Sequence, residues 1–150
     1  MAIYNLNDIL SKCGDDYLIL DFNHLFISSS IREEIWLLRR KNDLALLDKI
    51  MQEAREFNIY EASADRDFET YSGGQKAILG CLLTLAVIRD QKVHGLKLLL
   101  NHILDSVSEA NRSNLSGKFE QIHATHDMRL FTAEDDRIRE IFLGNENPKR

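Results

Sequence analysis

The segment from Tyr71 to Ala77 reads Tyr-Ser-Gly-Gly-Gln-Lys-Ala, and its residue types suggest a specific chemistry. It opens an apolar stretch that predicts a helix. The first amides of a helix lack intrahelical acceptors and the helix dipole makes this end positive, so a helix start suits an anion. Glycines let the backbone approach an anion's oxygen atoms closely. Ser72, Gly73, Gly74 and Gln75 are therefore candidate phosphate-binding residues.

This segment resembles the signature motif of ABC-type ATPases, particularly the SMC-like branch that works on chromosomes and DNA breaks. In that family the motif is presented across a dimer interface to the γ-phosphate of a nucleotide held by the other subunit. Two further segments follow in the family's order. Leu98 to Arg112 can be laid without gaps over the Walker B strand and D-loop, and Ala124 to Asp127 looks like the switch-histidine segment. The resemblance implies nucleotide contacts from Ser72 to Gln75 and from His126.

The chain departs from this family at the positions that carry catalysis. No segment has the glycines followed by Lys and Ser or Thr that form a Walker A phosphate cradle. Asn101 and His102 stand where the family has the magnesium aspartate and the glutamate that activates water, and Ser108 replaces the D-loop aspartate. The resemblance therefore implies a degenerate fragment whose ATP would be held by a partner ATPase. We expect the isolated chain not to hydrolyse ATP and to have no cofactor of its own.

A structural role explains part of the same segment. Ser72 and Gln75 have the spacing of a capping box, in which the serine hydroxyl and the glutamine side chain satisfy exposed amides reciprocally. This role requires no nucleotide. It leaves Gly73 and Gly74 unexplained, because each glycine in a helical first turn costs about 1 kcal/mol relative to alanine. The pattern by itself leaves open whether the segment is a helix cap or a nucleotide contact.

The histidines and acidic pairs carry weaker signals. His123 and His126 lie three residues apart, and His94 and His102 could approach them, but no clustered cysteines or carboxylates accompany them. We therefore expect no metal site. We assign no catalysis to the two acidic pairs, which are expected in a turn and in the first turn of a helix. These pairs are Asp15 with Asp16 and Asp135 with Asp136.

Trp36 precedes a short basic run, Arg39 to Lys41. These residues could stack on a base and grip a phosphate, yet on an acidic protein such a run is more typical of a solvated face or of a site for an acidic partner. Cys81 lies on the apolar face of a predicted helix, where we expect an unreactive core thiol.

Most of the elements that must position these residues have the apolar spacing of helices. Ser30 opens a Ser-Ile-Arg-Glu capping box, and the helix that follows is either one bent helix or two joined at Asn42, ending near Asn58. A central helix is expected from Gly74 to Arg89. Tyr17 to Ile27 is the best strand candidate, although a buried helix would have the same pattern.

Two further helices are predicted nearer the carboxyl terminus. Six apolar residues from Leu96 to Val107 keep helical spacing, which favours an amphipathic helix closed by polar residues from Asn111 to Gly117. A strand from Leu96 to Leu100 would instead favour the ABC-like alternative. Thr132 followed by acidic residues predicts a last helix ending at Gly144.

Composition places few limits on function. The 150 residues are 44% hydrophobic, and the net charge of −5 gives no overall positive field for nucleic acid or anionic lipid. Only Cys13 and Cys81 are present, which fits a reducing cytoplasm. No apolar run is long enough to span a membrane, and no signal peptide is expected.

We therefore expect a mainly α, single-domain helical bundle over residues 1–144, with a minor strand near Tyr17 to Ile27 and a frayed tail over 145–150. The alternative is an α/β fragment like the C-terminal half of an ABC ATPase head. The expected function is that of a non-catalytic cytoplasmic interaction protein, an adaptor, inhibitor or immunity-type partner. The alternative function is a degenerate SMC-like fragment that contacts nucleotide on a partner ATPase.

Overall fold

The structure, a computed structural model, describes residues 17–90, 94–134 and 137–143. Over these ranges it contains four α-helices and one four-stranded sheet. In chain order these elements are β1 (Tyr17–Asp21), α2 (Ile31–Arg39), α3 (Leu44–Glu56), α4 (Gly73–Asp90), β2 (Lys97–Asn101), α5 (Glu109–His126), β3 (Arg129–Glu134) and β4 (Arg137–Ile141). Three short 3-10 turns are η1 (Phe22–His24), η2 (Phe68–Thr70) and η3 (Leu104–Ser106). The fold class is α/β.

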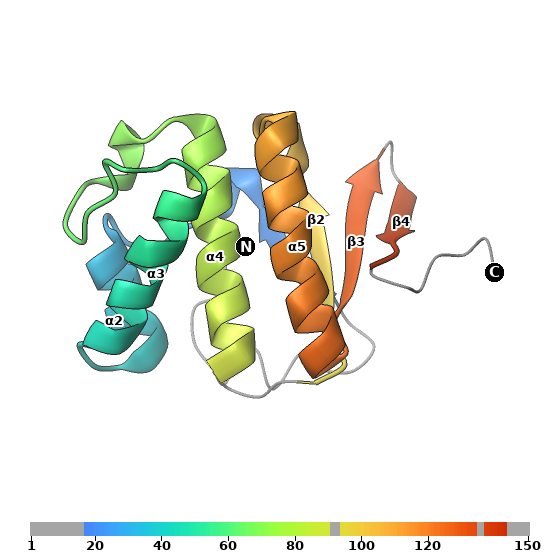
Figure 1. Cartoon of the computed structure of the whole chain (residues 1–150), viewed down its shortest axis with the longest axis horizontal. Helices are drawn as coiled ribbons and strands as arrows, with labels where there is room; N and C mark the ends of the chain where they lie inside the picture. The colour runs from blue at the N-terminus through green and yellow to red at the C-terminus, as the bar shows by residue number, and fades with distance from the viewer. Residues whose placement is uncertain (1–16, 91–93, 135–136, 144–150) are drawn as a thin grey trace.

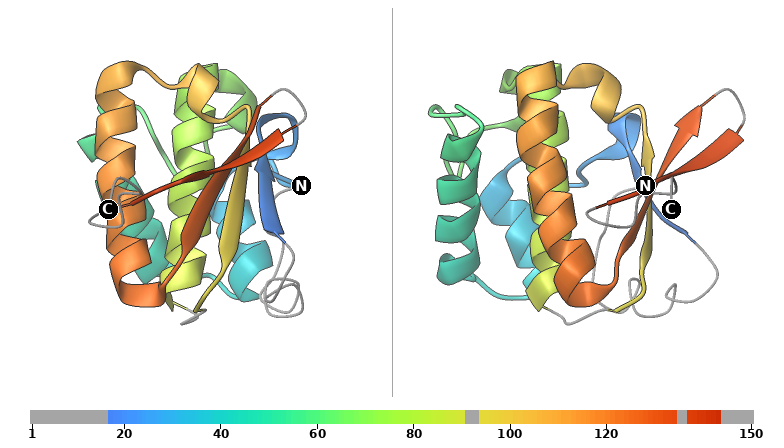
Figure 2. Two further views of the ribbon diagram at one scale, coloured as in Figure 1. Left: turned by 90° about the vertical axis from the view of Figure 1, so that its right-hand side faces the viewer. Right: turned by 45° about the vertical axis from the view of Figure 1, so that its right-hand side comes forward.

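The sheet has the strand order β1-β2-β3-β4, with the first three strands parallel and β4 antiparallel. Leu20 lies opposite Leu100, and Leu98 lies opposite Leu130. Each parallel strand is added on the same side of the one before it, so right-handed crossovers place both connecting helices on one face of the sheet. Figure 1 shows α4 and α5 side by side in front of β1 and β2, with β3 and β4 to the right of α5, and the β3–β4 hairpin forms one edge of the sheet (Figure 2).

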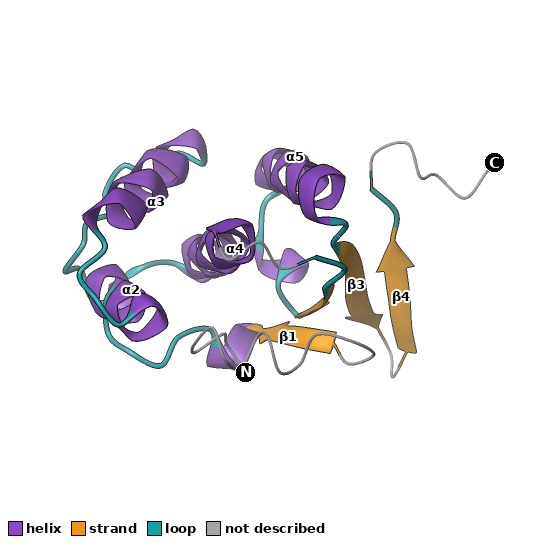
Figure 3. Ribbon diagram, turned by 90° about the horizontal axis from the view of Figure 1, so that it is seen from below, coloured by secondary structure: helices purple, strands orange, loops and turns teal. Residues whose placement is uncertain are grey.

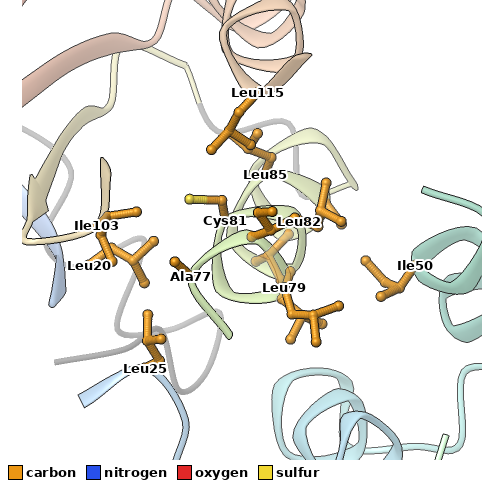
Figure 4. Close-up of a cluster of buried hydrophobic side chains, with 14 of the residues drawn as sticks. Leu20, Leu25, Ile50, Ala77, Leu79, Cys81, Leu82, Leu85, Ile103 and Leu115 are labelled. Carbon is orange, nitrogen blue, oxygen red and sulfur yellow. The ribbon is translucent and has the colours of Figure 1, made fainter. Parts of the chain in front are cut away.

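Helix α4 is the centre of the hydrophobic core. All of its residues from Ala77 to Ile88 are buried. The sheet and α5 cover part of its surface, while α2 and α3 flank it on the side away from α5 (Figure 3). Leu20, Ile50, Ile103 and Leu115, from four other parts of the chain, surround it (Figure 4). The predicted central helix is therefore confirmed, and its all-round apolar character follows from its position between the sheet and the other helices.

The prediction of a mainly α helical bundle is wrong. The stretch predicted as an amphipathic helix from Leu96 to Val107 forms strand β2, then a short loop and η3. Leu98, Leu99 and Leu100 are all buried. Since successive side chains of a strand point to opposite faces, β2, which lies between β1 and β3, is covered on both faces at this point. A strand buried in this way carries a continuous apolar run, which also fits a helical wheel.

The prediction of a last helix beginning at Thr132 is also wrong, because Thr132 lies inside β3, opposite Arg139 of β4. Conversely, the polar residues from Asn111 to Gly117, expected to close a helix, lie within α5. Leu115, Phe119, Ile122 and His126 are its buried residues, spaced four, three and four positions apart. That spacing is helical, but so few apolar residues in 18 make a weak pattern.

The remaining local predictions agree with the structure in outline. Tyr17 begins strand β1, although the strand is only five residues long. Ser30 caps α2 by accepting a hydrogen bond from the Glu33 amide, and Asp43 caps α3, so the region contains two helices. Several predictions lie outside the described residues, namely those for the carboxyl-terminal tail, Gly144, Cys13 and the acidic pairs Asp15 with Asp16 and Asp135 with Asp136.

Candidate functional site

The residues Ser72, Gly73, Gly74 and Gln75, here called the 72–75 segment, form the start of helix α4. The Gln75 amide donates to Ser72 Oγ over 3.1 Å, and the Ser72 amide donates to Gln75 Oε1 over 2.9 Å. These two bonds are the reciprocal pair of a capping box, as predicted. Gln75 Nε2 also donates to Glu61 Oε1, at 3.0 Å, which ties the cap to the loop after α3.

Two backbone amides of this first turn remain available. The Gln75 amide is used by Ser72 Oγ, and the Lys76 amide donates to the Ser72 carbonyl at 2.9 Å. The amides of Gly73 and Gly74 have no intrahelical acceptor, as expected for a helix start, and the described residues provide no other acceptor for them. Ser72 is exposed. The helix therefore presents free donors and the positive end of its dipole at the surface.

Both glycines pack against turns that follow strands of the sheet. A methyl group on the α-carbon of Gly74 would lie 2.7 Å from the carbonyl oxygen of Ser106 in η3, and one on Gly73 would lie 3.4 Å from Phe22 Cζ in η1. The first distance is too short for any real side chain. Close packing therefore requires glycine at position 74. At Gly73 the distance is that of an ordinary contact, so a small side chain would fit there.

The site lies at the carboxyl ends of the parallel strands. The turn η1 follows β1 directly, and η3 follows β2 after two residues. In Figure 2 these turns and the first turn of α4 lie at the same end of the molecule. Crevices at the carboxyl ends of strands are where open α/β sheets bind ligands.

A hollow of about 250 Å³ opens beside this first turn. Its lining residues are Phe22, Asn23, Leu25, Phe26, Ser28, Phe68, Glu69 and Lys76. Lys76 belongs to α4, and its Nζ lies 4.0 Å from Glu69 Oε2. The hollow therefore contains one ammonium group and one carboxylate.

Asn101 is the last residue of strand β2, and His102 follows it in the stretch that leads to η3. Asn101 is half-buried and His102 is exposed with a left-handed backbone, φ 59°. His102 Nδ1 lies 3.3 Å from Asp105 Oδ2. Ser108, matched to the D-loop aspartate, caps α5 by accepting from the Asn111 amide over 3.3 Å. Its hydroxyl is thus already used in a local cap.

The structure does not bring His126 to the 72–75 segment. His126 is buried at the carboxyl end of α5, where its Nε2 lies 3.2 Å from the Arg89 carbonyl. Arg89 is at the far end of α4 from Gly73, and the rise of an α-helix makes this separation about 25 Å. His126 also stacks on His94, with ring centroids 5.1 Å apart. Four of the five predicted nucleotide contacts therefore lie together, and the fifth lies elsewhere.

The histidines considered for a metal site lie at two ends of the molecule. His102 lies near η3, whereas His94 and His126 lie at the opposite end of α4. The residues that the structure describes contain no group of three or more His, Cys, Asp or Glu side chains arranged to hold a metal. Trp36 and the Arg39 to Lys41 run lie together around the end of α2.

Sequence reasoning missed the partners of the two glycines. Phe22 carries no signal in the sequence for this contact. Ser106 lies within the Leu98 to Arg112 stretch, and nothing in its sequence predicted a contact with Gly74.

No protein-family model matches the chain, and no curated protein matches it. None of the helices in the described ranges has the length and apolar character needed to cross a membrane.

Proposed function

We propose that this chain is a non-catalytic interaction protein that works with a partner ATPase, and that its 72–75 segment contacts the phosphates of a nucleotide held by that partner. The observation that carries the proposal is the packing of Gly74 on the Ser106 carbonyl. It joins two segments, 32 positions apart, that match the family's signature motif and D-loop region.

The secondary structure around Ser106 supports the same proposal. Residues 97–101 form a buried parallel strand, and a turn rather than a helix follows it. The match to a Walker B strand and D-loop requires this order of elements. A helix through this region would have been incompatible with it.

The exposed donors of the segment are suited to phosphate oxygens. The Gly73 and Gly74 amides, the exposed Ser72 and the helix dipole combine at one point, with Lys76 nearby. Two amides and one hydroxyl form a shallow contact rather than a cradle, and these 150 residues contain no Walker A sequence. The nucleotide would therefore be held mainly by the other protein.

Catalytic groups for hydrolysis are missing from the matched positions. Asn101 and His102 stand where the family has its magnesium aspartate and its glutamate. An amide is a weak magnesium ligand, and a histidine cannot be equated with that carboxylate base. Any hydrolysis in the complex would therefore depend on groups of the partner.

A pair of substitutions at Ser72 tests the proposal. Asn and Asp both cap helices about as well as Ser, so Ser72→Asn and Ser72→Asp should both fold with nearly unchanged melting temperature. They differ in charge. A carboxylate against a phosphate in a partly desolvated interface should weaken nucleotide-dependent association several-fold, whereas the neutral asparagine should not.

The measurement begins with tagged wild-type chain and native lysate, purified with Mg-ATP, with Mg-ADP and without nucleotide. A partner retained only with ATP is identified by mass spectrometry, purified, and titrated with the two variants. If association with the partner does not depend on nucleotide, or if Ser72→Asp and Ser72→Asn weaken it equally, the 72–75 segment acts only as a helix cap.

A further inference from the structure

A second surface, around Trp36 on helix α2, has the properties of a protein-docking site. A pocket of about 400 Å³ is lined by Ser28, Ser29, Glu33, Trp36 and Leu37, and is called the Trp36 pocket below. The Trp36 side chain is 50% exposed, and Ile27, in the loop that forms one wall, is 54% exposed. Large apolar side chains that remain in water beside a concavity favour burial by another molecule.

The wall of this pocket is held in place by two neighbouring carboxylates. Glu34 Oε1 accepts from the Ser28 amide at 3.0 Å and from Ser28 Oγ at 2.6 Å. Glu33 Oε1 accepts from the Ser29 amide at 3.1 Å. Because these bonds fix the loop against α2, a bound segment would meet a preformed surface and lose little free energy in ordering it.

Positive charge is concentrated at the carboxyl end of the same helix. Arg39 pairs with Asp43 at 3.1 Å. Arg40 and Lys41 are exposed, and Lys41 together with Arg39 acts on the single carboxylate of Asp43, whose pKa is lowered first by the Leu46 amide and then by these cations. The helix dipole adds no positive charge here, since this end is its negative end. Arg39, Arg40 and Lys41 against Asp43 thus form a local positive patch on a chain of net charge −5.

We propose that the Trp36 pocket docks a short segment of a partner protein that carries a large apolar side chain followed by acidic residues. The apolar side chain would fill the pocket against Trp36 and Leu37, and the carboxylates would face Arg40 and Lys41. A nucleic acid fits less well, because it carries a phosphate at every nucleotide and would place one beside the Glu33 carboxylate, whereas a peptide can carry its carboxylates on one side of the apolar residue only. This proposal does not depend on the proposed nucleotide contact.

Trp36 itself provides the readout, since it is the single tryptophan of the chain. Two pools of synthetic peptides of about 12 residues, free of tryptophan, would be titrated into the whole protein. The first pool has Phe or Leu at two positions followed by glutamates, and the matched pool has lysines in place of the glutamates. The acidic pool should shift Trp36 emission to shorter wavelength and reduce its quenching by acrylamide, and the basic pool should not.

Substitutions then locate the contact. With a fluorescein-labelled peptide from the acidic pool, the double variant Arg40→Glu, Lys41→Glu should bind about tenfold more weakly. Lys49→Glu, a charge reversal at an exposed position of α3, is the control and should bind within about twofold of wild type. Trp36→Ala should lose binding, and Leu44→Ala, another exposed apolar residue, should retain it.

Several results would overturn the proposal. It fails if neither pool moves the Trp36 emission, if both pools move it equally, or if Lys49→Glu weakens binding as much as the double variant. A single-stranded oligonucleotide that protects Trp36 better than the acidic peptides would assign the surface to nucleic acid instead. None of these outcomes bears on Ser72.

Discussion

The α-carbon of Gly74 lies so close to the carbonyl oxygen of Ser106 that an added methyl group would stand 2.7 Å from it. Gly74 is the second residue of α4 and Ser106 ends η3, so this contact fixes the first turn of the central helix on the turn that follows β2. In a helical first turn glycine is otherwise a poor choice. Its presence is explained by the closeness of the two backbones.

Gly74→Ala should therefore destabilise the protein by about 1–3 kcal/mol, since the overpacking exceeds the gain in helix propensity. The control is Gly117→Ala in α5, where an added methyl group meets nothing within 4 Å. This change should stabilise by about 0.5–1 kcal/mol. Urea unfolding of the two variants measures both effects. If Gly74→Ala is as stable as Gly117→Ala, the η3 turn yields to the methyl group and the contact is not a constraint.

Glu34 should make stability depend on pH. It is 2% exposed, and burial raises the pKa of its carboxyl above the usual 4.5, although hydrogen bonds from Ser28 and Ile27 oppose this shift. The folded state then binds more protons than the unfolded state, so the contribution of Glu34 to stability is full below pH 4.5 and falls as pH rises to the folded pKa. The free energy of unfolding of wild type, relative to that of Glu34→Gln, should therefore fall as the pH rises from 4.5 to the folded-state pKa of Glu34.

Urea unfolding of both proteins at a series of pH values tests this expectation. Ser28→Ala provides an internal check, because it removes the 2.6 Å hydrogen bond that favours the charged carboxylate. The pKa of Glu34 should then be higher still, and the fall in stability should extend to higher pH. Parallel pH profiles for wild type and Glu34→Gln would contradict the assignment.

Lys118 links α5 to α3 through two carboxylates of unequal burial. Its Nζ lies 3.2 Å from Glu53 Oε2 and 2.8 Å from Glu56 Oε1. Glu53 is 7% exposed, whereas the Glu56 side chain is 54% exposed. Lys118→Met should cost about 1–3 kcal/mol because it leaves the Glu53 carboxylate buried without a cation.

Glu56→Gln should cost less than about 1 kcal/mol, as is usual for exposed pairs. The double variant Lys118→Met, Glu53→Met should recover most of the loss, since an apolar pair leaves no buried charge. Thermal or urea unfolding measures all three. Equal effects of Lys118→Met and Glu56→Gln would show that the buried pair contributes nothing beyond a surface pair.

Cys81 should not react with thiol reagents in the folded protein. It is fully buried on α4 (Figure 4), and burial raises the pKa of its thiol to about 12. In a Cys13→Ser variant, Ellman's reagent at pH 8 should label no thiol without denaturant and one thiol in denaturant. Labelling of Cys81 at the rate of a free thiol under native conditions would mean that α4 opens readily.

The sequence alone determined the features that depend on residues three or four positions apart. The caps at Ser30 and Ser72 follow from hydrogen bonds between neighbours, and so does the extent of the central helix. The pattern after Ser30 leaves open one bent helix or two, and the structure has two. The apolar character of α4 around its whole circumference required a central position. These interactions are local, so a linear pattern contains the information that specifies them.

Tertiary structure decided the features that depend on distant partners. Leu100 lies in a strand because it pairs with Leu20, 80 positions earlier, and its apolar run alone fits a helix as well. Thr132 lies in a strand because β3 pairs with both β2 and β4. The same holds for the candidate site. Ser72 and Gln75 form their cap locally. The contact of Gly74 with Ser106 exists because the sheet brings the start of α4 next to the turn after β2. His126 is far from Ser72 because the carboxyl end of α5 lies at the other end of α4.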